Sequence, residues 1–353
     1  MRKFSISVQI VPVIAAMLTV GSLSGQTANS TTVADMTLSG SQISDPPPPT
    51  DDPGTLMIRP LGLAGARNPD PVGVNRGNGS GGGIPPIEKP GFYPADLSNP
   101  DNNPAIVTTL HHPIYVDRPS THWGDPAKFI KDLGKSEFME VVDQYVGASG
   151  SNRYKLGQGF KTASYLGTST YISINSIANL VSAAAIFGGK NFDHVYHVFL
   201  PKGVDTCFDA AKTVCYSPDI PKTFFFCAYH ASITYKDGSS LLFSVEPYQD
   251  VLGCSVPPTG SANSQLIDST DSVLSHEIFE TITDPLGTSW WVQALTFANG
   301  EEIGDLCTRA QQGSDSNYYW DYGKVKLNGN WYTVQPEYSN AFHGCVYSDL
   351  DKP

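Results

Sequence analysis

The chain has 353 residues, of which only 16% are charged, and its net charge is −12 from 22 basic and 34 acidic side chains. A nucleic-acid-binding protein is expected to carry a basic patch or stripe, and no cluster of Lys and Arg occurs in this sequence. The acidic balance also disfavours binding to anionic membrane surfaces. Composition therefore excludes nucleic acid as a partner and favours an acidic globular protein.

The N-terminus has the composition of an export signal. A basic start, Met1-Arg2-Lys3, is followed by an apolar run from Val8 to Leu23 and then by small residues. The run has 16 residues and contains Pro12, so it is short for a membrane span of roughly 20 residues. We predict a signal peptide over residues 1–25 and a secreted, extracellular protein without membrane association after cleavage. A periplasmic or cell-wall location and an uncleaved anchor stay open.

Proline and glycine are concentrated after this leader. Between Thr27 and Pro104 there are 14 Pro and 11 Gly, including the run Pro46-Pro47-Pro48-Pro49. Such a composition cannot bury enough apolar surface to offset the entropy lost on ordering. We therefore predict a disordered spacer over residues 26–104, followed by one globular domain over residues 105–353.

Six cysteines occur, and all of them lie in the C-terminal half. An even number in an exported chain indicates disulfides, for which six cysteines allow about 15 connectivities. A zinc–cysteine cluster is disfavoured because no Cys-x2-Cys pair occurs. Proximity in the sequence favours the pairs Cys207–Cys215, Cys227–Cys254 and Cys307–Cys345.

Helices and strands alternate early in the domain, and strands dominate later. Apolar side chains recur with helical spacing from Pro126, and Asp125 before it marks a helix start. The expected elements are a strand over 105–116, helices over 126–146 and 174–187, a strand over 193–200, paired strands over 224–235 and 239–246, a helix over 269–283, and a hairpin over 324–335 that turns at Asn328-Gly329. This order predicts an α/β or α+β domain with a mixed, twisted sheet.

One expected helix carries a pattern with chemical meaning, His276-Glu277-Ile278-Phe279-Glu280. On a helix His276 and Glu280 are four residues apart and project from the same face, as the two histidines of His-Glu-x-x-His do when they bind zinc. A carboxylate is an accepted zinc ligand in place of the second histidine. Glu277, about 100° around the helix, is then placed to deprotonate a water as the general base.

A third ligand must come from another segment. The candidates are Glu302 and Asp305, in Gly300-Glu301-Glu302-Ile303-Gly304-Asp305-Leu306-Cys307, with Glu302 the preferred one. The predicted metal ligands are thus His276, Glu280, Glu302 and Asp305, and Glu277 is the predicted catalytic residue. Zn²⁺ is the expected ion, although a site with one histidine and several carboxylates leaves calcium and manganese open. The plain alternative is a surface helix whose polar side chains are solvated.

At these residues the chain resembles the EXORDIUM-like, or phosphate-induced protein 1, family of secreted proteins. The similar blocks follow one another through about 240 residues of the domain: Pro113–Gly124, Phe129–Tyr145, Phe226-Cys227-Ala228-Tyr229-His230, Ser275–Pro285, Glu302–Cys307 and Tyr338–Cys345. The resemblance implies a cell-wall or apoplastic protein without an agreed enzymatic activity. Plant members look degenerate at the His-Glu-x-x-Glu segment, whereas this chain keeps it whole, and its long spacer departs from their layout.

Other side chains have weaker claims to a site. His194 and His197 lie in an expected strand, where residues three apart face opposite sides, so packing is the preferred interpretation. His230 lies on a strand that would pass under the active helix, but a core histidine is favoured. His111 and His112 are expected at an exposed strand end. The aromatics Trp290-Trp291, Tyr318-Tyr319-Trp320 and Trp331 form either core packing, which we favour, or a stacking wall for sugar or peptide.

These observations lead to two functional hypotheses. The first is a secreted, zincin-like metallohydrolase that acts on a peptide or amide bond. The second is a non-catalytic extracellular or cell-wall binding protein with a structural metal site or none. The expected partner is a peptide or a cell-wall polymer, and the sequence leaves the oligomeric state open. The expected fold is a zincin-like single domain with an active-site helix and a C-terminal β-rich part.

Overall fold

The computed structural model describes residues 33–35, 55–62, 96–256, 263–292, 302–307 and 323–348. The expected leader, residues 1–25, and the aromatic run Tyr318–Trp320 lie outside these ranges. Within the described ranges, no helix is both long enough and apolar enough to cross a membrane.

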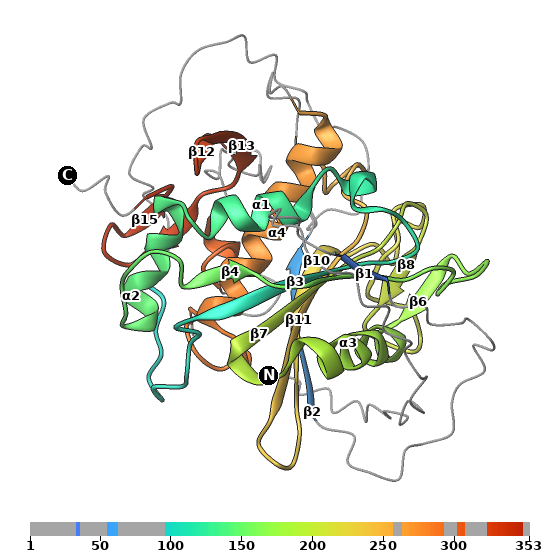
Figure 1. Cartoon of the computed structure of the whole chain (residues 1–353), viewed down its shortest axis with the longest axis horizontal. Coiled ribbons are helices and arrows are strands. Elements are labelled where there is room, and N and C mark those ends of the chain that lie inside the picture. The colour runs from blue at the N-terminus through green and yellow to red at the C-terminus, as the bar shows by residue number, and fades with distance from the viewer. Residues whose placement is uncertain are drawn as a thin grey trace, which may run out of the picture.

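A mixed sheet of eight strands organises the domain (Figure 1). Seven of its strands follow the order β1-β5-β3-β7-β11-β10-β2, and β4 pairs with β3 beside this path. The strands are β1 (Val33–Asp35), β2 (Thr55–Gly62), β3 (Thr109–Tyr115), β4 (Tyr154–Leu156), β5 (Gly159–Lys161), β7 (His194–Phe199), β10 (Phe226–Thr234) and β11 (Ser240–Glu246).

Strand direction divides this sheet into two parts. From β1 to β11 all neighbouring strands are parallel, and β10 is antiparallel both to β11 and to the outermost strand β2. The turn between β10 and β11 contains Gly238 at φ 82°, a conformation that favours glycine. The register sets His230 of β10 opposite Ser244 of β11, which in turn pairs with His197 of β7.

The remaining elements are short, apart from two helices. The helices are α1 (Pro126–Leu133), α2 (Asp143–Val146), α3 (Ile174–Gly188) and α4 (Gln265–Thr283), with 3-10 turns at Ser120–Trp123, Glu137–Val142, Asn191–Asp193 and Asp305–Cys307. The smaller sheets are formed by β6 (Tyr171–Ser173), β8 (Asp205–Cys207) and β9 (Cys215–Tyr216), by β12 (Gly323–Leu327) and β13 (Asn330–Val334), and by β14 (Glu337–Ser339) and β15 (Gly344–Val346).

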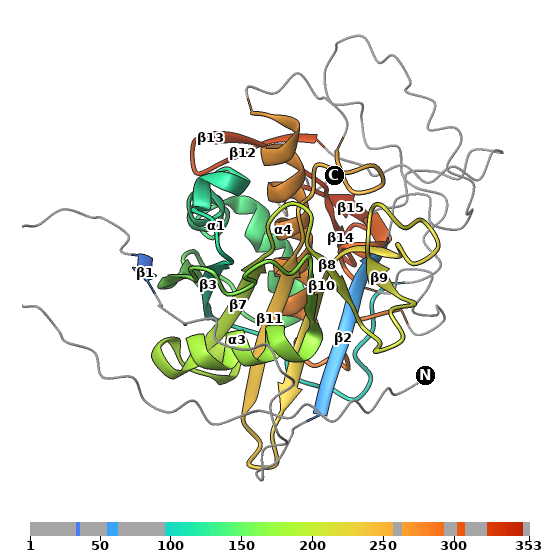
Figure 2. The ribbon, with the colours of Figure 1, turned by 90° about the vertical axis from the view of Figure 1, so that its right-hand side faces the viewer.

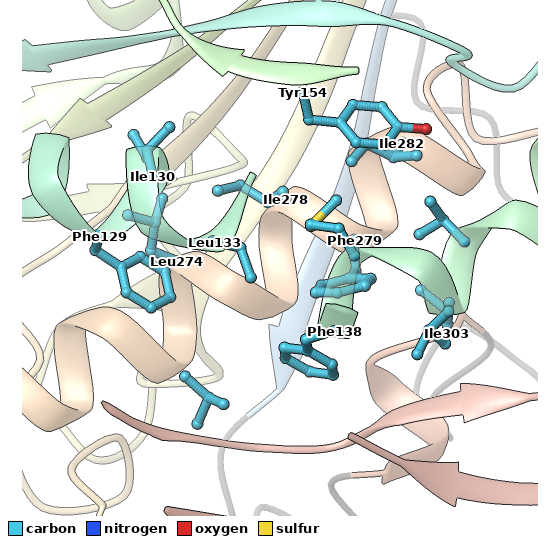
Figure 3. Packing of buried hydrophobic residues seen from close by; sticks show 14 of the residues in the cluster. Phe129, Ile130, Leu133, Phe138, Tyr154, Leu274, Ile278, Phe279, Ile282 and Ile303 are labelled. Atoms are coloured by element: carbon cyan, nitrogen blue, oxygen red, sulfur yellow. The ribbon is translucent and has the colours of Figure 1, made fainter. Parts of the chain in front are cut away.

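Helices cover both faces of the main sheet (Figures 1 and 2). On one face α3 packs Ile177 and Val181 against strand residues such as Tyr196 and Phe243. On the other face α4 and α1 form a second core with η2, the 3-10 turn Glu137–Val142, and the C-terminal strands. Figure 3 shows the centre of this second core, where Phe279 of α4 meets Phe138 with ring centroids 4.7 Å apart. The sheet therefore lies between two apolar layers, and α4 is central to one of them.

The expected elements agree with the structure in type and order. Asp125 caps α1, because its Oδ1 accepts a hydrogen bond from the Lys128 amide at 3.1 Å. The helix expected over 126–146 is, however, interrupted: α1 ends at Leu133 before Gly134, and the turn Glu137–Val142 and α2 follow. The paired strands β10 and β11 and the hairpin β12–β13 are present as expected. The mixed α+β architecture is confirmed.

The region expected to be a disordered spacer contributes two strands to the main sheet. β1 pairs with β5, and β2 pairs with β10 from Thr55 to Gly62. Leu56 is buried in the α3-side core with 5% exposure, so this part of the region does bury apolar surface. The expected boundary at residue 105 was therefore wrong for these segments, since composition averaged over Thr27–Pro104 conceals the apolar run Leu56-Met57-Ile58.

All three expected disulfides are present: Cys207–Cys215, Cys227–Cys254 and Cys307–Cys345. The first closes a short hairpin between β8 and β9, and the second ties β10 to the loop after β11. The third ties the segment Glu302–Cys307 to β15. Three disulfides indicate that the protein matures in an oxidising compartment.

We predict that Phe279→Ala lowers the free energy of unfolding by about 3–5 kcal/mol, because it removes a fully buried ring and leaves a cavity between α4 and Phe138. Urea denaturation followed by circular dichroism measures this change. Trp331→Ala is the control, since Trp331 is 63% exposed and its loss is expected to cost far less. Equal destabilisation by the two variants would contradict the packing described for α4.

Candidate metal centre

Helix α4 carries the predicted motif and is buried along most of its length. It begins after Ser264, whose Oγ accepts a hydrogen bond from the Ile267 amide at 3.3 Å, and it ends at Thr283, with Asp284 as the C-cap before Pro285. Every residue from Asp268 to Thr283 is buried, because α4 packs against β10, β11, β13 and α1. A buried helix with this many polar side chains must satisfy them inside the protein.

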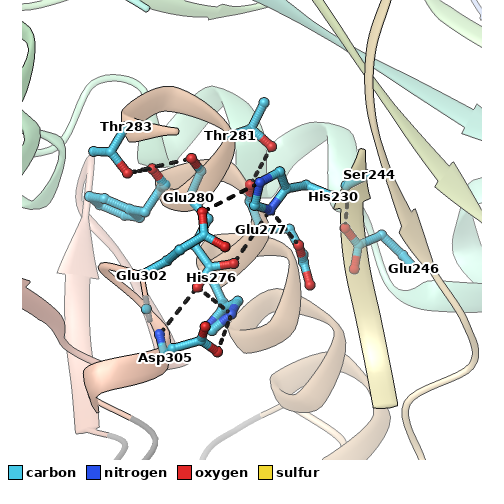
Figure 4. A network of polar contacts seen from close by, with 12 residues as sticks. His230, Ser244, Glu246, His276, Glu277, Glu280, Thr281, Thr283, Glu302 and Asp305 are labelled. Carbon is cyan, nitrogen blue, oxygen red and sulfur yellow. Dashed lines mark hydrogen bonds and ion pairs between the residues drawn. The ribbon is translucent and has the colours of Figure 1, made fainter. Parts of the chain in front are cut away.

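The sheet presents polar side chains to α4 from β10 and β11. Successive residues of a strand face opposite sides, so His230 points to the side opposite Tyr229 and Ala231, which belong to the α3-side core. Ser244 is the partner of His230 in the register, and Glu246 lies two residues further along the same face of β11. His230, Ser244 and Glu246 thereby face the helix that carries His276, Glu277 and Glu280 (Figure 4).

A third segment, residues 302–307, adds Glu302 and Asp305. The C-terminal part of the chain holds it in place: the Gln335 amide Nε2 donates to the Gly304 carbonyl at 3.0 Å, and the Tyr338 amide donates to the Ile303 carbonyl at 3.0 Å. The disulfide Cys307–Cys345 secures its end. Gly304 lies against the His276 ring, where an added Cβ would come within 2.4 Å of Nδ1. Glycine is therefore required for the close approach of this segment to α4.

The first group of candidate ligands is His276, Glu280 and Asp305. His276 Nε2 lies 2.9 Å from Glu280 Oε1 and 3.8 Å from Asp305 Oδ1. The same Glu280 oxygen accepts a hydrogen bond from the Asp305 amide at 3.2 Å. Both ring nitrogens of His276 are buried and have no hydrogen-bond partner among the described residues. The short contact with Glu280 has the distance of an ion pair but not the geometry of a hydrogen bond. A buried, unpartnered histidine beside carboxylates has the donor chemistry of a metal ligand.

The second group is His230, Glu280 and Glu302. His230 Nδ1 lies 3.4 Å from Glu280 Oε2 and 3.6 Å from Glu277 Oε2, and its Nε2 lies 3.5 Å from Glu302 Oε1. Among the residues described, neither ring nitrogen has a hydrogen-bond partner. The two groups share Glu280, with Oε1 facing His276 and Oε2 facing His230.

The carboxyl groups of this site differ strongly in their affinity for protons. Burial raises the pKa of Glu277 well above its ordinary value, and the nearby charges of Glu280, Glu246, Asp305 and Glu302 raise it further. Burial also opposes ionisation of Glu280, but the adjacent His276 and His230 lower its pKa to about 2. The surroundings therefore favour the ionised form of Glu280, whereas they oppose ionisation of Glu277 in the metal-free protein.

The histidine and two further carboxyls complete this electrostatic picture. Burial disfavours protonated His276, yet the charge of Glu280 and the contacts with Glu280, Asp305 and Gln335 raise its pKa. Burial raises the pKa of Glu246 to about 8. Glu337 is fully buried, and burial together with the charges of Glu280 and Asp305 raises its pKa well above the ordinary value. A cation placed among these groups would lower the pKa of each carboxyl and release protons.

A chain of buried hydrogen bonds extends from Glu246 across the sheet. Ser244 Oγ donates to Glu246 Oε1 at 2.6 Å, so it accepts from His197 Nδ1 at 2.7 Å. His197 Nε2 is then the acceptor for His111 Nδ1 at 2.8 Å. All three donors point toward Glu246, which fixes the tautomers of both histidines and orients the Glu246 carboxyl beside the site.

The expectation for His111 and His112 was wrong, because both side chains are buried and do not lie at an exposed strand end. The two side chains face opposite sides of β3, and each meets one histidine of β7: His111 contacts His197, and His112 Nε2 lies 3.1 Å from His194 Nδ1. As expected from their spacing, His194 and His197 face opposite sides of β7 and are not a ligand pair: His194 contacts His112, and His197 belongs to the hydrogen-bond chain. Pairing between strands distant in sequence makes these contacts, so adjacency in the sequence could not reveal them.

The structure brings all five predicted site residues together. Of the two candidates for a third ligand, Asp305 falls in the group with His276, whereas Glu302, the preferred one, falls in the group with His230. His230 is buried but not the satisfied core histidine that was favoured, since neither ring nitrogen has a hydrogen-bond partner among the described residues, and it belongs to the second candidate group. The signal for its place was the alternation of its strand beneath the helix. Sequence reasoning missed Glu246 and Glu337, which have no distinguishing pattern around them.

The aromatic residues do not form a common wall at this site within the described ranges. Trp290 packs on Tyr145 with ring centroids 5.3 Å apart, and Trp331 is 63% exposed on the separate β12–β13 hairpin. Packing was the favoured interpretation for Trp290, and the structure agrees.

The chain matches no family model, no curated protein and no solved structure in the three comparisons. The resemblance to EXORDIUM-like proteins therefore stays a prediction. The geometry gives a buried cluster of two histidines and several carboxyl groups that could hold a metal ion.

We predict that Gly304→Ala weakens zinc binding at least tenfold, because the added methyl group would displace the His276 ring. Competition with a fluorescent zinc chelator measures the affinity. Gly147→Ala is the matched control: it strains a backbone at φ 65° with nothing within 4 Å of the added carbon, so it changes stability without touching the site. If both variants bind zinc equally well, Gly304 does not position His276.

We predict that acidification destabilises the protein through His111. Burial and the nearby His112 lower the pKa of His111 to about 3, below its value of 6.5 in the unfolded chain. Between these two pH values the unfolded chain binds a proton at this histidine and the folded protein does not. As the pH drops below 6.5, the free energy of unfolding therefore falls by up to about 1.4 kcal/mol per pH unit.

Urea denaturation at several pH values between 7 and 4 tests this expectation with His111→Asn, whose amide nitrogen can still donate to His197. The slope of the unfolding free energy against pH should decrease by up to about 1.4 kcal/mol per pH unit, which corresponds to one proton fewer taken up on unfolding. His343→Asn is the control, because it makes the same change in a side chain that is 73% exposed. An unaltered slope in His111→Asn would show that His111 does not remain neutral in the folded protein.

Proposed function

We propose that the protein is a secreted, metal-dependent hydrolase that cleaves a peptide or amide bond. His276, Glu280 and Asp305 would hold the metal, for which zinc is the first choice, and Glu277 would be the general base. The observation that carries this proposal is the pair His276–Glu280, one helical turn apart and 2.9 Å between Nε2 and Oε1, with Glu277 buried beside it.

The residues fit a divalent cation. Both ring nitrogens of His276 and both oxygens of Glu277 are buried without hydrogen-bond partners among the described residues. Each polar group that is buried without a hydrogen-bond partner destabilises the folded protein by about 1–3 kcal/mol. A cation would accept the lone pairs of His276 and Glu280 and offset the repulsion between the carboxylates. Zinc tolerates this mixture of imidazole and carboxylate ligands.

When bound, the metal would polarise the substrate carbonyl and lower the pKa of water at the site. The protein side chains perform the proton transfers. Glu277, ionised in the presence of the cation, accepts a proton from the attacking water and then passes it to the nitrogen of the departing amine. Its pKa, raised by burial and by the surrounding carboxylates, suits both steps. Gln335, whose amide lies beside His276 and donates to Gly304, holds the ligand in place.

Export supports a substrate outside the cell. Three disulfides form only where thiols are oxidised, and the basic and apolar N-terminus predicts a signal peptide. A secreted peptide or a peptide linkage of a cell-wall polymer is the corresponding substrate.

A second candidate function is a non-catalytic binding protein with a structural metal. Burial of the ligands favours it: His276 is fully buried, Glu280 is 1% exposed and Asp305 is 9% exposed. Structural metal sites are closed, whereas catalytic sites keep a position open to substrate. Metal content and hydrolysis must therefore be measured together.

We predict that Glu277→Gln retains stoichiometric zinc but loses hydrolysis of a quenched fluorescent peptide library by about 100-fold or more, the usual effect of removing a general base. His276→Ala should lose zinc as well. Zinc is measured by elemental analysis after dialysis, and Glu137→Gln is the control because it makes the same change at an exposed site.

Two results would contradict the proposal. The first is wild-type protein that contains no zinc, manganese or calcium when it is analysed after dialysis against each ion. The second is equal hydrolysis by Glu277→Gln and the wild type. Zinc binding with no hydrolysis in either protein would favour the structural site instead.

A further inference from the structure

Glu280 turns its two oxygens toward two different sets of ligands. Oε1 faces His276 Nε2 at 2.9 Å, on the side of Asp305, and Oε2 faces His230 Nδ1 at 3.4 Å, on the side of Glu302. His230 and His276 belong to separate ligand groups, and Glu280 is the residue common to both. A carboxylate with a different ligand set at each oxygen has the arrangement of a bridge between two cations.

The carboxyls of the two ligand groups carry more charge than one divalent ion would balance. Six carboxyl groups surround the site: Glu246, Glu277, Glu280, Glu302, Asp305 and Glu337. The ion pairs described for these carboxyls are with His230 and His276. Glu280, Glu302 and Asp305, which belong to the two ligand groups, carry three negative charges when ionised, and one divalent ion balances two of them. A second divalent ion would balance the remaining charge and any further carboxyl that ionises.

The second position has the same marks of a ligand site as the first. Both ring nitrogens of His230 and both oxygens of Glu277 are buried without a hydrogen-bond partner within the described part of the chain. His230 Nδ1 lies 3.6 Å from Glu277 Oε2, and His230 Nε2 lies 3.5 Å from Glu302 Oε1. His230 comes from β10, the sheet strand that packs on α4, so its position is fixed by the fold and not by a loop. Figure 4 shows His230 above Glu280 and His276 below it, with the Glu280 carboxylate between them.

We propose that the centre binds two divalent metal ions bridged by Glu280, one held by His276 and Asp305 and the other by His230 and Glu302. This inference rests on the metal site of the proposed function and adds a second ion to it. Two-metal hydrolytic centres place ions about 3.5–4 Å apart and hold both the attacking and the leaving group. A mixed set of imidazoles and carboxylates suits zinc or manganese at both positions.

The test is the number of ions per chain and whether they interact. Full-length protein is dialysed against Zn²⁺ or Mn²⁺ and analysed for metal, and the manganese form is examined by electron paramagnetic resonance. We expect two ions per chain in the wild type and a spin-coupled manganese pair. Asp305→Asn and Glu302→Gln should each bind one ion and lose the coupled signal, and Glu280→Ala should lose the coupling and at least one ion.

Asp193→Asn is the matched control, because it removes an exposed carboxylate far from the bridge and should keep both ions and the coupled signal. If a site variant fails to fold, the stoichiometry and the resonance spectrum of the wild type decide the question alone. A maximum of one ion per chain would overturn the proposal, and so would two ions without magnetic coupling.

These outcomes are separate from those of the proposed function. One bound ion together with hydrolysis that depends on Glu277 keeps the hydrolase and rejects the second ion. A coupled pair of ions in a protein without hydrolytic activity keeps the two-metal centre and rejects the hydrolase.

Discussion

Repulsion among carboxyl groups buried between α4 and the main sheet is the constraint on which the rest of the structure depends. Glu277, Glu280 and Glu302 are at most 2% exposed, so water does little to screen them from one another. The only ways to relieve this repulsion are protons, imidazolium groups or a bound cation. In the metal-free protein the two histidines lower the pKa of Glu280, whereas burial and the neighbouring carboxyls raise the pKa of Glu277 and Glu337.

The scaffold around this cluster is correspondingly rigid. α4 is enclosed by a sheet, a helix and a hairpin, and the segment that brings Glu302 and Asp305 is held by a disulfide and by hydrogen bonds to Gly304 and Ile303. Such restraint is what a pre-organised metal centre requires, because ligands that repel one another would otherwise separate in the free protein. The apolar core formed by Phe279 and its neighbours supplies the stability that offsets the cost of keeping these charges buried.

Local patterns in the sequence were sufficient for the hairpins, the disulfides, the motif on α4 and most of the helices, but they did not reveal the interruption after Leu133. They act over a few residues, and the spacing of His276 and Glu280 already fixes their common face. The positions of Glu302 and Asp305 relative to α4 depend on a disulfide and on contacts with β14, so their order of preference could not be decided. His230 and Glu246 enter the site through the register of β10 and β11, which is a property of strand pairing over long distances. β2 was concealed by the glycine and proline around it.

The pairing of β2 with β10 also has a consequence for the order of folding. β2 is synthesised before the rest of the main sheet except β1, yet its partner β10 follows more than 160 residues later in the chain. The edge of the sheet next to His230 can therefore be completed only after β10 and β11 have formed, and a long loop must close to do so. Until then β10 exposes unpaired backbone groups, which makes the unfinished edge the place where this protein is most prone to pair with another copy.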